Sequence, residues 1–248
     1  MTAMKTTAIH TPLFQENDDL EQFITQAIDS QLGGLPEKCV LVVTSKIISY
    51  AQGRLVEKKT GERKEKLNLA RQEADQYLPN SYSRFDMIMA IKNHTLTVNA
   101  GVDESNASGK YVLWPEKMQA VVNQLWQFLR QHYQVKHLGV IVTDSRTWPL
   151  RWGVIGTCLV HCGFQQLTDY IGQEDLFGRE ITMVKVNVAE AIAAAAALEM
   201  GEVAEQTPLG LVEEIKQIQF QDQPPTEQEL KELRIEIEND VYGPLLTA

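Results

Sequence analysis

Apolar residues recur at helical spacing in five stretches of the chain, and each stretch predicts a helix with one buried face. The first follows a helix-start signal at Asn17–Asp19, the third begins at Pro115, and the fifth begins with the capping-box pattern Thr226-x-x-Glu229. We expect the fifth helix to continue to about Asp240. The apolar positions are Leu20, Phe23, Ile24, Ala27 and Ile28; Leu67, Ala70, Ala74 and Leu78; Met118, Val121, Val122, Leu125, Trp126 and Leu129; Ala189–Met200; and Leu230, Leu233, Ile237 and Val241.

Shorter apolar runs predict β-strands between these helices. Two of them are continuous, as in strands buried on both faces, and two alternate around Asn93-His94, which predicts a hairpin. The predicted strands are Cys39–Val43, Met87–Ile91, Thr95–Val98, Leu138–Thr143 and Ile181–Val186. Because helices and strands are mixed along the chain, the fold class is α/β or α+β.

Two aspartates follow predicted strands and are candidate metal ligands. Asp103 lies in a turn with Gly101 and Asn106, and Asp144 follows the apolar run Leu138–Thr143. Carboxylates on strand-end loops suit Mg²⁺ or Mn²⁺, which prefer oxygen ligands and share them with phosphates. The alternative is that Asp103 caps a turn and Asp144 caps a helix. For each aspartate alone the capping role is the simpler interpretation, and for the pair the two are evenly balanced.

Composition limits the class of protein. With 248 residues and 44% hydrophobic content, the chain can form one large domain or two closely joined ones. A net charge of −10 argues against nucleic-acid binding, which needs a basic surface. The start MTAMKTTAIH has no long apolar region, and Ala189–Met200 is too short to span a bilayer. We therefore expect a soluble cytoplasmic protein that does not bind membranes.

Three cysteines cannot form an even set of disulfides, which fits a reducing compartment. Cys158-x-x-His161-Cys162 resembles half of a zinc site, but no second ligand pair follows at a usual spacing. Cys39, Cys158 and Cys162 are therefore expected to be free, buried thiols. The chain also lacks a P-loop, a G-x-G-x-x-G motif and a G-x-S-x-G motif, so any nucleotide would be bound by a less common fold.

Six separate motifs resemble the coenzyme F(420)-0:L-glutamate ligase family, in that family's order. They are TPLF (Thr11–Phe14), SKIISYAQGR (Ser45–Arg54), NAGVDESN (Asn99–Asn106), VTDSRTWPLRWG (Val142–Gly153), LTDYIGQEDLFGRE (Leu167–Glu180) and AEAIAAAAALEMGE (Ala189–Glu202). The resemblance runs from about Thr11 to Leu211. The form TDSRT-x-PLR, with LWP at Leu113–Pro115, is similar to a bacterial subgroup labelled as a folate-metabolism γ-glutamate ligase.

The resemblance implies a γ-glutamyl ligase that uses GTP and a divalent metal. GTP phosphorylates a carboxylate acceptor, and the amine of L-glutamate then attacks the acyl phosphate to form an amide. Mg²⁺ or Mn²⁺ is the implied metal, with K⁺ as an optional further ion. The implied fold is an unusual two-part α/β ligase fold that forms an intertwined homodimer, with residues 1–215 as the ligase-like domain and 216–248 as a C-terminal helical extension.

The resemblance also implies roles for individual residues. Asp103 and Asp144 hold the first metal, and Ser145 and Glu202 help to hold a second. Nucleotide contacts fall to Pro12, Leu13, Phe14, Ser45, Lys46, Asn106, Met200, Gly201 and Thr207, with the segment Met200–Thr207 wrapped around the nucleotide. The alternative roles are turn capping for Ser45 and Ser145, a solvated lysine for Lys46, and an exposed acid at a helix end for Glu202.

Two arginines flank the second aspartate and suit forked contacts with a carboxylate or phosphate. We favour Arg151 over Arg146 as the substrate-binding catalytic-site residue. Asp175, Arg179 and Glu180 are equally consistent with an internal ion-pair network and with a functional role.

The chain departs from the family pattern at two places. Tyr50 replaces a lysine expected near the nucleotide, and TDSRTWPLR replaces the usual TDT-x-GRPWR beside the metals. The acceptor is therefore open: an F(420)-0-like molecule is the leading candidate, and a folate-like molecule with the same chemistry is the close alternative. A catalytically silent, nucleotide-binding regulatory protein is the alternative from a different class.

Overall fold

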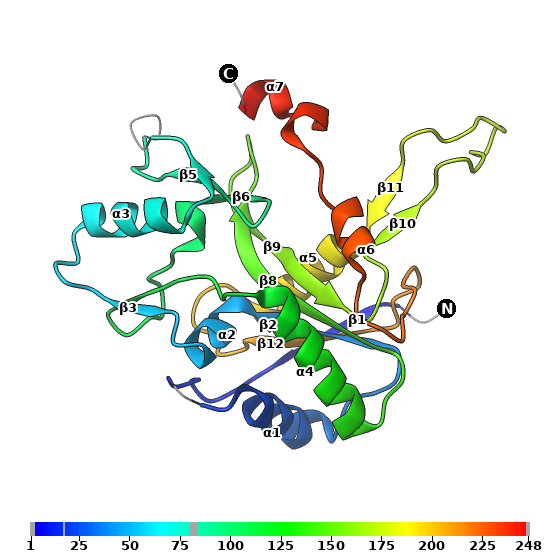
Figure 1. Ribbon diagram of the computed structural model, residues 1–248. Coiled ribbons are helices and arrows are strands. Elements are labelled where there is room, and N and C mark those ends of the chain that lie inside the picture. Colours follow the sequence, from blue (N-terminus) through cyan, green and yellow to red (C-terminus); the bar gives the residue numbers. More distant parts are fainter. Residues whose placement is uncertain (1–2, 17, 80–83, 247–248) are drawn as a thin grey trace.

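The computed structural model describes residues 3–16, 18–79 and 84–246. At its centre is a mixed sheet with strand order β1-β12-β2-β8-β9 (Figure 1). These strands are β1 (Lys5–Ile9), β12 (Leu209–Glu213), β2 (Cys39–Thr44), β8 (Leu138–Thr147) and β9 (Val154–Cys162). β2 and β8 run parallel, whereas the other neighbouring pairs are antiparallel. The predicted mixed α/β class is therefore confirmed.

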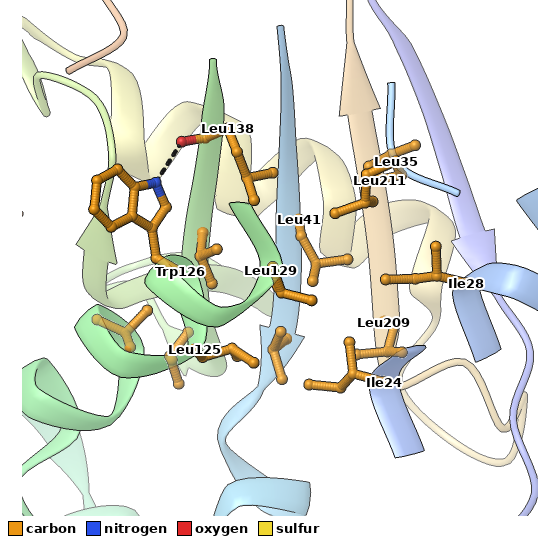
Figure 2. Close-up of a cluster of buried hydrophobic side chains, with 14 of the residues drawn as sticks. Ile24, Ile28, Leu35, Leu41, Leu125, Trp126, Leu129, Leu138, Leu209 and Leu211 are labelled. Atoms are coloured by element: carbon orange, nitrogen blue, oxygen red, sulfur yellow. Dashed lines mark hydrogen bonds between the residues drawn. The ribbon is translucent and has the colours of Figure 1, made fainter. Parts of the chain in front are cut away.

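Three helices cover one face of this sheet: α1 (Leu20–Leu32), α2 (Ser45–Ala51) and α4 (Met118–Tyr133). Their apolar residues pack against β2, β8 and β12 in the largest hydrophobic cluster, part of which Figure 2 shows. Within it, Trp126 Nε1 donates a hydrogen bond of 2.7 Å to the carbonyl oxygen of Leu138. This bond satisfies the one polar group of the largest fully buried side chain.

The opposite face is covered by α5 (Val188–Met200), which confirms the predicted alanine-rich helix. Asn187 caps it by accepting a hydrogen bond from the backbone of Glu190. The small side chains let the helix lie very close to the sheet, because a Cβ added at Gly156 would come within 2.8 Å of the Ala193 carbonyl oxygen. Residues that follow α5 therefore lie at the same end of the sheet as the ends of β2 and β8.

A third hydrophobic cluster lies beyond this sheet. It contains residues of α3 (Arg63–Glu73), of the paired strands β3 (Leu55–Glu57) and β7 (Lys110–Val112), and of β5 (Met89–Lys92). β5 lies between β4 (Gln76–Tyr77) and β6 (Thr95–Val98) in a three-stranded sheet. The predicted hairpin is confirmed, and both turn residues have the positive φ that tight two-residue hairpins require: 49° at Asn93 and 60° at His94. A short 3-10 helix, η2 (Asn99–Gly101), then leads toward Asp103.

The strands β10 (Leu167–Asp169) and β11 (Lys185–Asn187) form the base of an arm that projects from the body (Figure 1). The chain ends with α6 (Glu227–Glu232), η3 (Ile237–Asn239) and α7 (Gly243–Leu246). The described residues contain no helix that is both long and apolar enough to cross a membrane. All three cysteines are free and buried, as predicted.

Several predicted boundaries are wrong for local reasons. The helix expected from Pro115 begins at Met118, because Lys117 has a left-handed backbone conformation with φ of 48°. The helix expected to include Leu78 ends at Glu73, since the following residues pair with β5. At the first helix, Asp19 is the cap and accepts a hydrogen bond of 2.8 Å from Gln22, while Asn17 lies outside the described residues.

Two further predictions need larger corrections. The strand expected at Ile181–Val186 is only Lys185–Asn187, because most of the preceding residues belong to the projecting arm. The capping box at Thr226 and Glu229 is confirmed, but the helix it starts ends at Glu232 and not near Asp240. This helix buries none of its residues, so no tertiary packing supports a longer one.

Candidate functional site

A cavity of about 700 Å³ opens where β2 and α2 meet the outer part of β8. Its walls come mainly from five places in the sequence: the segment after β1, the β2–α2 junction, the region from β6 to Ser108, the outer part of β8 at Thr143–Ser145, and the segment that follows α5. Tertiary folding therefore gathers most of the motifs that are separate in the sequence around one space.

Asp103 is held on one side of the cavity by a dense set of donors. Its carboxylate lies 2.6 Å from Lys46 Nζ and accepts hydrogen bonds from the backbone of Glu104 and from the backbone and hydroxyl of Ser105. Burial alone would raise its pKa, but Lys46 and Ser105 outweigh burial and lower the pKa to about 2. The carboxylate is therefore ionised at neutral pH. The predicted turn-capping role is also present and does not exclude a ligand role.

Asp144 faces the same cavity in an opposite environment. The predicted strand end at Thr143 is wrong: β8 continues to Thr147 because β9 pairs with it throughout, and Asp144 lies opposite Thr157. It therefore cannot cap a helix. Its carboxylate accepts hydrogen bonds from Trp114 Nε1 and the Ser145 backbone. Burial raises the pKa of Asp144 despite these bonds, and the nearby charge of Asp103 raises it further.

Trp114 also explains a glycine in the NAGVDESN motif. Gly101 has φ of 73°, and an added Cβ would collide with the Trp114 ring. Glycine at this position thus lets the indole reach Asp144 while the chain turns toward Asp103. Trp114 belongs to the LWP motif, and nothing in the sequence spacing links residue 114 to residue 144, so its role is visible only in the structure.

The segment after α5 closes another wall of the cavity. The Ser145 hydroxyl donates a hydrogen bond of 2.5 Å to Glu202, and the Asn106 amide donates one of 2.5 Å to the carbonyl oxygen of Val203. Thr207 donates a hydrogen bond back to the Met200 carbonyl oxygen. These contacts tie the loop that carries Asp103 and the strand that carries Asp144 to one wrapping segment.

Most of the predicted site residues line this cavity. They are Pro12, Leu13, Phe14, Ser45, Lys46, Asp103, Asn106, Asp144, Ser145, Met200, Gly201, Glu202 and Thr207, together with Tyr50. Neither Arg146 nor Arg151 is among the lining residues; Arg151 is exposed in the turn between β8 and β9, and Arg146 is half-buried on β8. Lys66 lines the cavity and was missed, because its sequence context is an ordinary charged helix face.

The charges around the cavity fit a divalent metal. Its described walls include four carboxylates (Asp103, Asp144, Glu202 and Glu205), whereas the two lining lysines already form ion pairs, Lys46 with Asp103 and Lys66 with Glu104. A buried carboxylate such as Asp144 needs a counter-charge, and an all-oxygen donor set suits Mg²⁺ or Mn²⁺. No three His, Cys, Asp or Glu side chains of the described part are already grouped as a metal centre. To serve as a metal ligand, Asp103 would have to lose its ion pair with Lys46.

Comparison with known proteins gives a consistent result. A family model described as F420-0:Gamma-glutamyl ligase matches residues 8–214, a span that contains every residue lining the cavity.

Curated relatives carry the name coenzyme F420:L-glutamate ligase. The protein of Methanopyrus kandleri is 31% identical over 206 residues, covering 77% of this chain and 79% of that protein. The protein of Archaeoglobus fulgidus is 30% identical over 216 residues, covering 81% and 83%. That of Methanosarcina mazei is 27% identical over 214 residues, covering 81% and 82%.

Proposed function

Because the chain belongs to the F420-0:γ-glutamyl ligase family, we propose that it joins L-glutamate to a small carboxylate acceptor at the expense of GTP. A carboxylate oxygen of the acceptor attacks the γ-phosphorus of GTP, and GDP leaves. The amine of L-glutamate then attacks the acyl carbon and phosphate leaves, which gives an amide. The observation that carries the proposal is the single cavity that Asp103, Asp144 and Lys46 share within the matched span.

Asp103 and Asp144 are proposed to hold a first Mg²⁺ or Mn²⁺, and Ser145 and Glu202 to help hold a second. The bound ions would neutralise the charge that develops on the transferring phosphoryl group. Lys46 lies 2.6 Å from Asp103, so it is within reach of the same phosphates once a metal replaces it beside that carboxylate. Burial raises the pKa of Asp144, and no cation among the described residues forms an ion pair with it, which supports this assignment.

The nucleotide is proposed to lie between the segment after β1 and the segment after α5. Pro12, Leu13 and Phe14 offer apolar contacts, and Ser45 and Asn106 offer polar ones. The segment Met200–Thr207 would wrap the nucleotide and exclude water, which protects an acyl phosphate from hydrolysis. Gly201, with φ of 78°, is suited to this close approach.

We also propose that the working form is a homodimer. The arm beyond β10 and β11 exposes Leu176, Phe177 and Met183, each by at least 85% of its side-chain surface. Apolar side chains on a projecting arm are costly unless a second chain covers them. Light scattering during size-exclusion chromatography should give twice the chain mass of 28.0 kDa. A monomer at micromolar concentration would contradict this part of the proposal.

The decisive experiment is mass spectrometry of products formed with GTP, Mg²⁺ or Mn²⁺, L-glutamate and a panel of acceptors. The panel includes F(420)-0 and folates, since either acceptor suits the proposed chemistry. A product heavier by one glutamyl unit, absent when GTP is omitted, would support the ligase and identify its acceptor. Saturable nucleotide binding without any product would favour the regulatory alternative, and absence of nucleotide binding would contradict the proposal.

A further inference from the structure

Arg146 lies on β8 two residues beyond Asp144 and on the same face of that strand. The pairing of β8 with β9 is regular from Asp144 to Thr147, so alternate residues share a face. Ser145, between them, points to the opposite face and contacts Glu202 after α5. Two residues of extended strand separate the two positions by about 6.6 Å. Arg146 is not a lining residue of the cavity and lies on β8 just beyond the Asp144 wall.

The guanidinium of Arg146 has no acidic partner among the described residues. It is half-buried, and its Nε is fully buried without a hydrogen-bond acceptor. Both lysines of the cavity are already paired with carboxylates, which makes Arg146 different from them. A partly buried cation without an acceptor loses hydration that nothing in the protein replaces. Such a group is suited to an anionic ligand.

Trp148 fixes the orientation of this guanidinium. The guanidinium carbon lies 4.8 Å from the centre of the Trp148 ring. Stacking uses the flat face of a guanidinium and leaves the N–H groups along its edge free for a forked contact. The ligand best matched to that edge is a carboxylate.

We propose that Arg146 binds a carboxylate of the incoming L-glutamate, an assignment that rests on the proposed ligase function. L-glutamate carries two carboxylates that do not react, and it must approach a cavity already lined by Asp103, Asp144 and Glu202. Without an opposing cation, these acids would repel it. The guanidinium of Arg146, two residues along β8 from Asp144, holds the amino acid at the edge of the reacting centre and orients its amine.

Steady-state kinetics with L-glutamate, and separately with GTP, as the varied substrate tests this assignment. Arg146→Gln should raise the KM for L-glutamate at least tenfold while leaving the KM for GTP and kcat within about threefold, because the lost contact is to one substrate. Arg146→Lys should recover part of the loss. Arg234→Gln is the matched control, since Arg234 is exposed in the C-terminal segment. Thermal unfolding of each variant verifies that it is folded.

Two analogues identify the carboxylate. L-glutamine lacks the side-chain carboxylate, and L-isoglutamine lacks the α-carboxylate. For the analogue that lacks the group bound by Arg146, the wild type and Arg146→Gln should have equal KM values. An equal rise of KM for L-glutamate and both analogues would overturn the assignment, because Arg146 would then act on something other than a carboxylate.

The clearest test against the assignment compares Arg146→Gln with the same substitution at the neighbouring Arg151. If Arg151→Gln raises the KM for L-glutamate and Arg146→Gln does not, the preference from sequence is correct and the assignment to Arg146 is wrong. If the wild type forms product and neither variant changes the KM, the assignment fails while the ligase function stands. If the wild type forms no product, calorimetric binding of L-glutamate decides. Weaker binding by Arg146→Gln supports the assignment, whereas equal or absent binding overturns it.

Discussion

The two ends of the β8–β9 strand pair have opposite characters. At the inner end, Leu138–Val142 is fully buried, and His161 on β9 is enclosed with 1% of its surface exposed. At the outer end, the same strands carry the buried carboxylate of Asp144 and the guanidinium of Arg146, and neither forms an ion pair with any residue that the structure describes. The inner end satisfies its polar groups within the protein, while the outer end leaves opposite charges for ligands.

This difference shows how one pair of strands serves stability and binding together. The inner residues pack against α4 and thereby fix the positions of both strands. The outer residues lie on the same strands and are held in place by them, but they add little packing of their own. Changes at the outer end should therefore reduce activity more than stability, and changes at the inner end should do the reverse.

The largest expected effect is at the outer end. Asp144→Asn should reduce turnover at least 1000-fold, or about 4 kcal/mol, because it removes a proposed metal ligand while keeping the side-chain shape. Its midpoint of thermal unfolding should be unchanged or higher, since a buried charge is removed. Product formation and scanning calorimetry measure the two effects. Asp222→Asn, at an exposed surface carboxylate, is the control, and full turnover in Asp144→Asn would exclude Asp144 from the reaction.

The inner end should respond in the opposite way. Trp126→Ala removes a large buried side chain and its hydrogen bond to Leu138, and should lower the free energy of unfolding by about 3–5 kcal/mol. Urea denaturation measures this loss. The KM values of the fraction that remains folded should stay near those of the wild type. A strong rise in KM without loss of stability would mean that the two ends are not separable.

His161 makes the inner end sensitive to acid. Burial lowers its pKa to about 4, although Glu229 acts in the other direction. In the unfolded chain the ordinary pKa of histidine is about 6.5, so between these pH values the unfolded state binds a proton that the native state does not. Stability is therefore fully present above pH 6.5, and its loss down to pH 4 reaches about 3 kcal/mol from this group.

Denaturation of the wild type and of His161→Gln at several pH values measures this contribution. The difference in unfolding free energy between the two proteins should change between pH 6.5 and 4 and be constant above pH 7. Turnover at pH 7.5 should be similar in both, apart from any loss of folded protein. An unchanged difference across that range would show that His161 is not the responsible group.

The smallest expected effect is again at the outer end. Ser145→Ala removes the hydrogen bond to Glu202 from an exposed side chain, so stability should change by about 1 kcal/mol or less. Turnover should fall no more than about tenfold, because a hydroxyl is an accessory ligand beside two carboxylates. A restored rate at higher Mn²⁺ concentration would support a metal role, and a loss as large as that of Asp144→Asn would reverse the order of importance proposed for these residues.

Much of the fold follows from local patterns in the sequence. The buried strand at Cys39, the helix at Ala189 and the hairpin at Asn93 are fixed by apolar periodicity and turn preference, which act over a few residues. Boundaries failed where longer-range contacts decide. β8 extends past its apolar run because β9 pairs with it, and the helix after Thr226, none of whose residues is buried, ends at Glu232.

The candidate site also has one part that follows from the sequence and another that depends on tertiary contacts. By itself the sequence identified the family and the candidate site residues, because the resemblance depends on motifs such as NAGVDESN and VTDSRTWPLRWG. Only the tertiary structure decided their environments: Lys46 lies beside Asp103, Trp114 against Asp144, and the guanidinium of Arg146 over the Trp148 ring with a buried Nε. Partners in the site are separated by up to 97 residues, as Asn106 and Val203 are, and leave no periodic signal. The pKa of a carboxylate depends on burial and charges that exist only after folding.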